Sequence, residues 1–155
     1  MIKGIKWGTN ISDLPGMVLM GAVGSGKRVY TRKGEREKIG DAHIEMVMYG
    51  FYRDKLEDVQ IHFRSWDNFV KLREILFKVC GPGRQRIRSL ESYHWYGKRI
   101  SVFLAYNKIL GKGAIGYTFL PICREEQEDR KVMKAKYKEM VEYFNIAGNA
   151  SRSVM

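Results

Sequence analysis

The stretch HIEMVMYGFYRDKLEDVQIHFR, residues 43–64, predicts two strands joined by a tight polar turn. Its second half, Leu56–Arg64, alternates apolar and polar residues, which is typical of a strand with one buried face. Its first half, His43–Tyr52, carries apolar residues on both faces and therefore predicts a strand near the centre of a sheet. With Arg53-Asp54-Lys55 as the turn, the stretch forms an antiparallel hairpin on which the rest of the fold can build.

A helix is predicted directly after this hairpin. Ser65 or Asp67 can cap its start, and Gly81 followed by Pro82 ends it, since glycine accepts the left-handed cap and proline cannot continue a helix. Its apolar residues recur at helical spacing: Phe69, Leu72, Ile75, Leu76 and Val79.

Working outward, the pattern predicts a short helix at Ile11–Leu14, a long helix at Glu125–Phe144 and six more strands. These strands are Gly4–Gly8, Met17–Ala22, Arg28–Arg32, Ser92–Tyr96, Arg99–Asn107 and Gly113–Leu120. Hairpin links dominate and alternating strand–helix units are absent. We therefore expect an α+β fold, an antiparallel sheet of meandering strands with helices packed on one face. We expect one domain over residues 1–145 and a flexible tail over 146–155.

The composition suits a globular domain that favours anionic partners. Hydrophobic residues make up 45% of the 155 residues, and the net charge is +11. Such a charge attracts nucleic acid, anionic lipid head groups or acidic proteins, although a soluble domain can also simply be basic. No apolar run approaches the roughly 18 residues of a membrane span. The first residues do not resemble a signal peptide, so we expect a periplasmic or envelope protein if a leader was removed and a cytoplasmic one otherwise.

One segment matches the consensus of a phosphate-binding loop. Gly21–Lys27 fits G-x-x-x-x-G-K after an apolar run, but Arg28 stands where the motif needs Ser or Thr for magnesium. The residues that follow, Val29–Lys38, have no helical stripe, yet the loop must open a helix. We therefore interpret Gly24-Ser25-Gly26 as the turn of a hairpin.

No catalytic, cofactor or metal site is predicted. His43, His62 and His94 lack ligand spacing and are interpreted as solvent-facing or hydrogen-bonded strand residues. Glu57 and Asp58 are adjacent in a strand and should point to opposite faces. Cys80 and Cys123 are interpreted as buried thiols, with one disulfide as the alternative, and Cys80 at a helix C-terminus is a poor nucleophile.

A basic cluster is the candidate surface for an anionic partner. Tyr93, Trp95 and Tyr96 are interleaved with it, and aromatic residues beside arginines can stack on single-stranded bases. Half of these aromatic residues should face the core, because they lie in a strand. The cluster consists of Arg84, Arg86, Arg88, Lys98 and Arg99.

Several phrases of the chain resemble a bacterial family of exported, lipoprotein-like proteins without assigned activity. They are Gly4-Ile5-Lys6-Trp7-Gly8-Thr9, Tyr49-Gly50-Phe51-Tyr52, Phe69–Phe77 with Gly81-Pro82, and Gly113–Pro121. More distantly, a strand ending in Trp-Gly before a short helix resembles the superfamily of β-lactamase inhibitor protein and the small lipoprotein of outer-membrane assembly. The resemblance implies a non-enzymatic binding module and supplies no catalytic residues.

We therefore expect a non-enzymatic binding or accessory domain of the bacterial cell envelope, with a protein or an anionic surface as partner. The first alternative is a basic nucleic-acid-binding protein. A phosphate-loop nucleotide enzyme that uses Lys27 is the second.

Overall fold

The computed structural model describes residues 5–24 and 26–153, with side chains up to residue 147. The chain divides into two compact units, Met1–Cys123 and Arg124–Met155, and each is treated by itself. The first unit contains the sheet and the second consists of a single helical segment.

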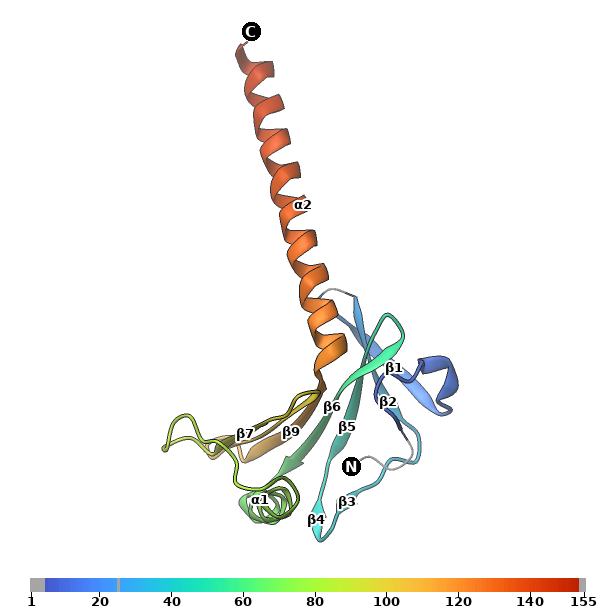
Figure 1. Ribbon diagram of the computed structural model, residues 1–155, viewed down its shortest axis with the longest axis vertical. Coiled ribbons are helices and arrows are strands. Elements are labelled where there is room, and N and C mark those ends of the chain that lie inside the picture. The colour runs from blue at the N-terminus through green and yellow to red at the C-terminus, as the bar shows by residue number, and fades with distance from the viewer. Residues whose placement is uncertain (1–4, 25, 154–155) are drawn as a thin grey trace. The chain divides into compact units, whose positions relative to one another are not determined.

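The first unit is built on a seven-stranded sheet whose neighbouring strands all run antiparallel (Figure 1). In sheet order the strands are β1 (Met17–Val23), β2 (Lys27–Arg32), β5 (Met46–Tyr52), β6 (Lys55–Arg64), β9 (Lys112–Phe119), β8 (Ile100–Asn107) and β7 (Ser92–Tyr96). The predicted α+β class and antiparallel sheet are confirmed.

The hairpin of β5 and β6 lies at the centre of this sheet, as its sequence predicts. Arg53 and Asp54 form its turn with φ of 48° and 63°, a left-handed pair that matches the twist of the two strands. Val59, Ile61 and Phe63 of β6 are at most 4% exposed and share one face. That face is the floor of the core.

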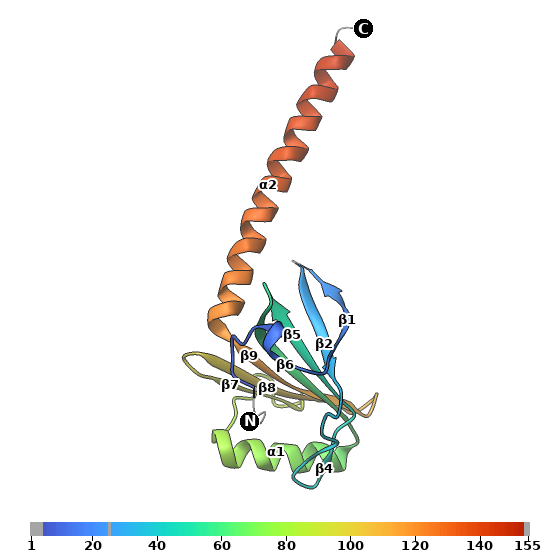
Figure 2. The same cartoon turned by 90° about the vertical axis from the view of Figure 1, so that its right-hand side faces the viewer.

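Helix α1, Trp66–Cys80, covers this floor (Figure 2). Ser65 caps its start by accepting a hydrogen bond from the Asn68 N–H, and Gly81 ends it with φ of 81°. Phe69, Leu72 and Leu76 are buried against the sheet, as predicted. Val79 was predicted to be part of the same stripe, but it is 76% exposed because it lies in the last turn of the helix.

Two segments beside α1 differ from the prediction. The region predicted as one strand from His43 is split, since β4 (Ala42–His43) pairs with a short strand β3 (Lys38–Ile39) that sequence patterning missed. The Asn68 side chain accepts a hydrogen bond from the His43 N–H at 3.0 Å, which ties this hairpin to α1. A Cβ on Gly40, at the tip of the hairpin, would lie 3.0 Å from Ile75.

The predicted strand at the start of the chain is also wrong for the part that the structure describes, and Gly4 lies outside that part. Trp7 and Gly8 form a turn, because Gly8 has φ of 76°. The Gly8 N–H donates to the Leu56 carbonyl, and the Trp7 ring stacks on Phe119 at 5.9 Å. The predicted short helix is confirmed as the 3₁₀ turn η1 (Ile11–Asp13), capped by Asn10.

Helix α2 spans Leu120–Ser153 and is longer than predicted at both ends. It starts at Leu120 because Pro121, which ends a strand, fits well in the first turn of a helix. Its backbone is helical through 146–153, which we expected to be part of a flexible tail. Within the described chain, no helix combines the length and the apolar character that crossing a membrane requires.

Side chains pack so closely in the central sheet that one added methyl group should disturb them. A Cβ on Gly116 of β9 would lie 2.0 Å from the Phe103 ring, whereas a Cβ on Gly21 of β1 would meet nothing within 4 Å. We expect Gly116→Ala to lower the free energy of unfolding by about 1–3 kcal/mol through overpacking. Gly21→Ala should change it by less than about 0.5 kcal/mol in the same urea denaturation experiment. Equal effects of the two substitutions would contradict this packing.

Candidate functional site

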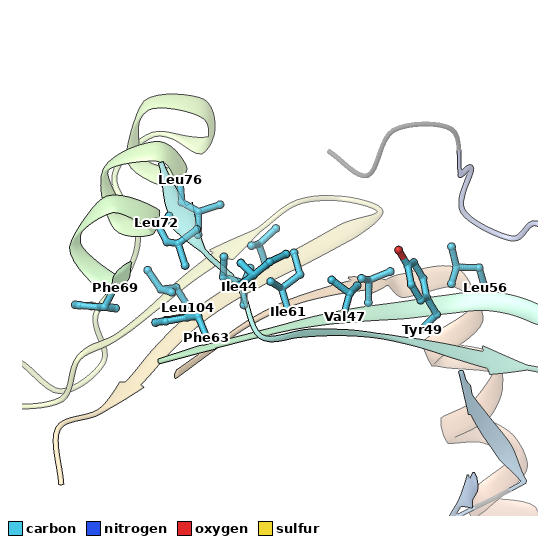
Figure 3. Packing of buried hydrophobic residues seen from close by; sticks show 14 of the residues in the cluster. Ile44, Val47, Tyr49, Leu56, Ile61, Phe63, Phe69, Leu72, Leu76 and Leu104 are labelled. Carbon is cyan, nitrogen blue, oxygen red and sulfur yellow. The ribbon is translucent and has the colours of Figure 1, made fainter. Parts of the chain in front are cut away.

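An apolar cavity of about 460 Å³ lies between the sheet and α1. We call it the sheet–helix cavity. Its floor comes from the buried face of four central strands, and Figure 3 shows Val47, Tyr49 and Ile61 projecting from that floor to the side on which Leu72 and Leu76 lie. The lining residues are Ile5, Trp7, Glu35, Arg36, Ile39, Ile44, Val47, Tyr49, Leu56, Ile61, Leu72, Ile75, Leu76, Val79, Cys80, Ile100, Val102, Ile115 and Tyr117.

The solvent exposure of the lining residues increases from the floor of the cavity to its rim. Floor residues such as Tyr49 and Ile115 are at most 1% exposed. Ile39 and Ile75 at the side are half-buried, and Val79 at the rim is exposed. A molecule that entered would therefore pass partly exposed aliphatic side chains before it reached the buried floor.

One wall of the cavity is polar. The Tyr49 hydroxyl donates a hydrogen bond to Oε2 of Glu35, and Oε1 of the same carboxylate accepts from the Arg36 N–H at 3.0 Å. Burial raises the pKa of Tyr49 above its usual value, and the neighbouring Glu35 raises it further. Tyr49 is therefore a neutral hydrogen-bond donor at neutral pH. Glu35 and Arg36 lie in a loop without periodic pattern, so sequence reasoning could not identify them.

A second phenol lies across the floor. Tyr117 of β9 lines the cavity with Cys80, the last residue of α1. Burial raises the pKa of Tyr117 to about 12, and the Cys80 thiol adds a smaller effect in the same direction. Cys80 is exposed and Cys123 is half-buried, so the prediction of two buried thiols is wrong for Cys80.

The opposite face of the sheet carries a wider, open hollow of about 630 Å³. Glu91 at its edge is 3.4 Å from Lys108 and 3.9 Å from Arg73. His62 also lines it, and within the described residues its buried Nε2 has no hydrogen-bond partner, unlike the hydrogen-bonded or solvent-facing histidine that we predicted. This hollow is more open than the sheet–helix cavity, and its acidic lining residue, Glu91, pairs with Lys108, so it is the weaker candidate.

The segment that matches a phosphate-binding loop forms a hairpin, as interpreted. Lys27 starts strand β2 and not a helix, and its ammonium group forms an ion pair with Asp58 and lies 4.0 Å from Glu57. Ser25 lies outside the described residues. The lysine is thus held by carboxylates on β6 and not presented to a phosphate.

The same contact corrects the prediction that Glu57 and Asp58 point apart. Gly50 pairs with Asp58 and Phe51 pairs with Leu56, which leaves Glu57 as the extra residue of a bulge. The bulge breaks the strict alternation of the strand, so both carboxylates reach the same lysine. Neither hollow is lined by them.

The predicted basic cluster is divided between the two faces of the sheet. Arg84 pairs through its backbone with His94 on the edge strand β7, and Arg86 donates a hydrogen bond to the Tyr96 hydroxyl at 3.0 Å. Arg99 instead lies over the Phe119 ring on the face that α1 covers, 5.2 Å from the ring centre. Arg88 and Lys98 are exposed.

The aromatic residues of β7 divide in the same way, as the period of a strand requires. Tyr93 and Trp95 pack against Phe77 of α1, and the Trp95 indole donates to the Gly81 carbonyl at 2.9 Å. His94 and Tyr96 face the other side and stack with ring centres 5.9 Å apart. Tyr96 is exposed and His94 is half-buried, so this second pair presents a ring surface to a partner.

No group of three or more histidine, cysteine, aspartate or glutamate side chains could hold a metal ion in the part of the chain that the structure describes.

The raised pKa of Tyr117 predicts a specific dependence of stability on pH. The pKa is about 12 in the folded protein against the ordinary tyrosine value of 10.0, so this stabilisation is complete below pH 10 and is lost as the pH rises towards 12. Tyr117→Phe removes the ionisable group. In urea denaturation, wild type should lose about 1 kcal/mol more than Tyr117→Phe between about pH 9 and pH 11.

The control for the loss of a phenol is Tyr143→Phe, at a tyrosine that is 70% exposed in α2. Parallel pH profiles for wild type and Tyr117→Phe would show that Tyr117 is not buried as described.

Comparison of the chain with protein-family models, with curated proteins and with solved structures finds no match. The family resemblance drawn from its sequence phrases therefore stays a prediction, and the function has to be argued from the cavity and the surface.

Proposed function

We propose that this protein is a non-enzymatic binding domain that holds a small, mainly apolar molecule in the sheet–helix cavity. The observation that carries the proposal is the cavity itself, about 460 Å³ and lined almost entirely by aliphatic and aromatic side chains. Ligand sites in proteins have volumes of roughly 300–1,000 Å³ and combine such walls with few polar groups.

Close packing supports this proposal. Protein interiors leave few voids larger than a water molecule, because each lost contact costs dispersion energy. An apolar cavity of this size beside the main core of a small unit lowers stability unless an apolar molecule fills it. The cost is offset when a ligand replaces the missing contacts.

The polar wall indicates which chemical groups the ligand carries. Tyr49 and Glu35 place a hydroxyl and a carboxylate at one side of the cavity, and Arg36 adds a cation at the exposed margin. A ligand with one polar end and an apolar body satisfies both regions, since a polar group left unpaired in the cavity costs free energy. Placement of the domain in the bacterial envelope, and its lack of enzymatic activity, are parts of the proposal that rest on the sequence.

Binding of N-phenyl-1-naphthylamine, a neutral apolar fluorophore, tests the cavity without interference from the net charge of +11. We expect saturable fluorescence enhancement with micromolar affinity. Ile39→Trp, which fills the cavity from its side, should weaken binding at least about 10-fold, equivalent to about 1.4 kcal/mol. Val18→Trp is the matched control, because Val18 is a β1 residue that is 40% exposed and lies outside the cavity.

A second readout uses the free thiol at the cavity. In a Cys123→Ser background, the fluorophore should slow the reaction of Cys80 with iodoacetamide, because Cys80 is both exposed and part of the lining. Absence of saturable binding, or equal weakening by Ile39→Trp and Val18→Trp, would contradict the proposal.

One observation favours a second function, binding of single-stranded nucleic acid. Tyr96 is 57% exposed, stacks on His94 and accepts a hydrogen bond from Arg86, so an aromatic platform and a cation lie together on the face opposite α1. Aromatic side chains beside arginine stack on bases with little sequence preference. The basic cluster of Arg84, Arg86, Arg88, Lys98 and Arg99 would then bind phosphates, with Arg99 contributing least because it lies on the other face.

A salt series with labelled single-stranded DNA tests this second function. We expect affinity to fall steeply with salt, and Arg86→Glu with Tyr96→Ala to weaken binding at least about 10-fold. Arg99→Glu is the control on the other face and should weaken binding less. No binding at moderate salt, or a stronger effect of Arg99→Glu, would remove this function.

A further inference from the structure

We propose that α2 lies on the surface of anionic membranes through a stripe of apolar side chains that lysines flank on both sides. This interaction surface is independent of the sheet–helix cavity. We call it the lysine-flanked stripe, and its apolar members are Met133, Tyr137, Met140, Val141 and Phe144.

The stripe is large and open to solvent. Tyr137 is 66% exposed, Phe144 is 64% exposed and Met133 is 65% exposed. Spacings of three and four residues place all five members on one side of the helix, because α-helical residues recur every 3.6 positions. A contiguous apolar surface of this kind normally marks an interaction site.

The charges around the stripe indicate the occupant. Each residue of an α-helix is turned by about 100° around the helix axis from the one before it. If the angular position of Tyr137 is set to zero, the other stripe residues lie within about 60° of it on either side. Lys134 and Lys138 then lie at about 60° and 100° on one side, and Lys136 lies at about −100° on the other. Glu139 and Glu142 fall more than about 130° away, on the far side. Lysine stems extend along apolar surface while their ammonium groups reach outward, as at the head groups of an anionic bilayer.

Other occupants fit the sequence of α2 less well. A coiled coil with a second copy needs apolar residues at 3.5-residue spacing over three or four heptads. When the spacing of the stripe is continued towards the N-terminus of α2, the next two positions are Arg130 and Glu126, which form an ion pair with each other. The apolar repeat therefore spans only about two heptads. The helix also cannot span the bilayer, since no stretch of it is apolar enough among the described residues. The arrangement that fits α2 is therefore a helix that lies in the interface between membrane and water.

The test is flotation of the full chain with vesicles of phosphatidylcholine alone and of phosphatidylcholine with about one-third phosphatidylglycerol. We expect binding to the anionic vesicles, little binding to the neutral ones, and release by salt, because lysines near anionic head groups supply part of the affinity. The double variant Met133→Gln with Phe144→Gln should reduce binding to anionic vesicles at least about 10-fold.

The matched control is Val132→Gln with Tyr143→Gln. Val132 is 51% exposed and Tyr143 is 70% exposed, and both are direct neighbours of the replaced residues on other sides of the helix. Both doubles leave the charge unchanged and keep helix-forming side chains. Circular dichroism checks that both retain the helix.

Three outcomes would overturn the proposal. One is the absence of binding to anionic vesicles. Another is equal binding by the two doubles, which would assign the interaction to the basic sheet unit. The third is a concentration-dependent dimer in solution that only the stripe variant disrupts, which would assign the stripe to a second copy of the chain. Fluorophore binding to the cavity should be unchanged in both doubles, so failure here is distinguishable from failure of the proposed function.

Discussion

Burial of the apolar face of β6 beneath α1 is the contact on which the sheet unit depends. Phe63, next to the end of this strand, lies below Phe69 and Leu72, which are at most 1% exposed (Figure 3). Burying a side chain of this size contributes roughly 1.5–3 kcal/mol, and the face must be covered because a bare sheet face loses all of it. The pairing of β6 with β5 on one side and β9 on the other then sets the register of the remaining strands.

The same geometry leaves the sheet–helix cavity beside the core. Helix α1 spans 15 residues and covers only part of one face of the seven-stranded sheet. The remainder is bordered by loops and by the β3–β4 hairpin, whose backbone is held to α1 by Asn68. Space stays open over Tyr49 and Tyr117, and burial keeps both phenols protonated.

The two proposed surfaces use different physics. The cavity offers a ligand apolar walls, so its selectivity depends on shape and on the few polar groups around Tyr49 and Glu35. The stripe on α2 offers an apolar strip that a broad surface can cover, and its lysines bias the choice towards anionic head groups. Neither activity requires a metal or a covalent step. Both fit a domain that binds.

Local patterns in the sequence determined most of the secondary structure. The alternation in β6, the spacing of Phe69 and Leu72, and the glycine and proline after Cys80 each act over a few residues, so their outcome could be derived from the chain alone. The prediction of a strand at Trp7 and Gly8 was wrong. A left-handed glycine and stacking of Trp7 on Phe119, which is distant in sequence, overrode the extended pattern. Tertiary structure alone decided the cavity and the meeting of Lys27, Glu57 and Asp58. A cavity is the space between elements, and a bulge depends on the partner strand. Neither feature produces a periodic pattern in the sequence.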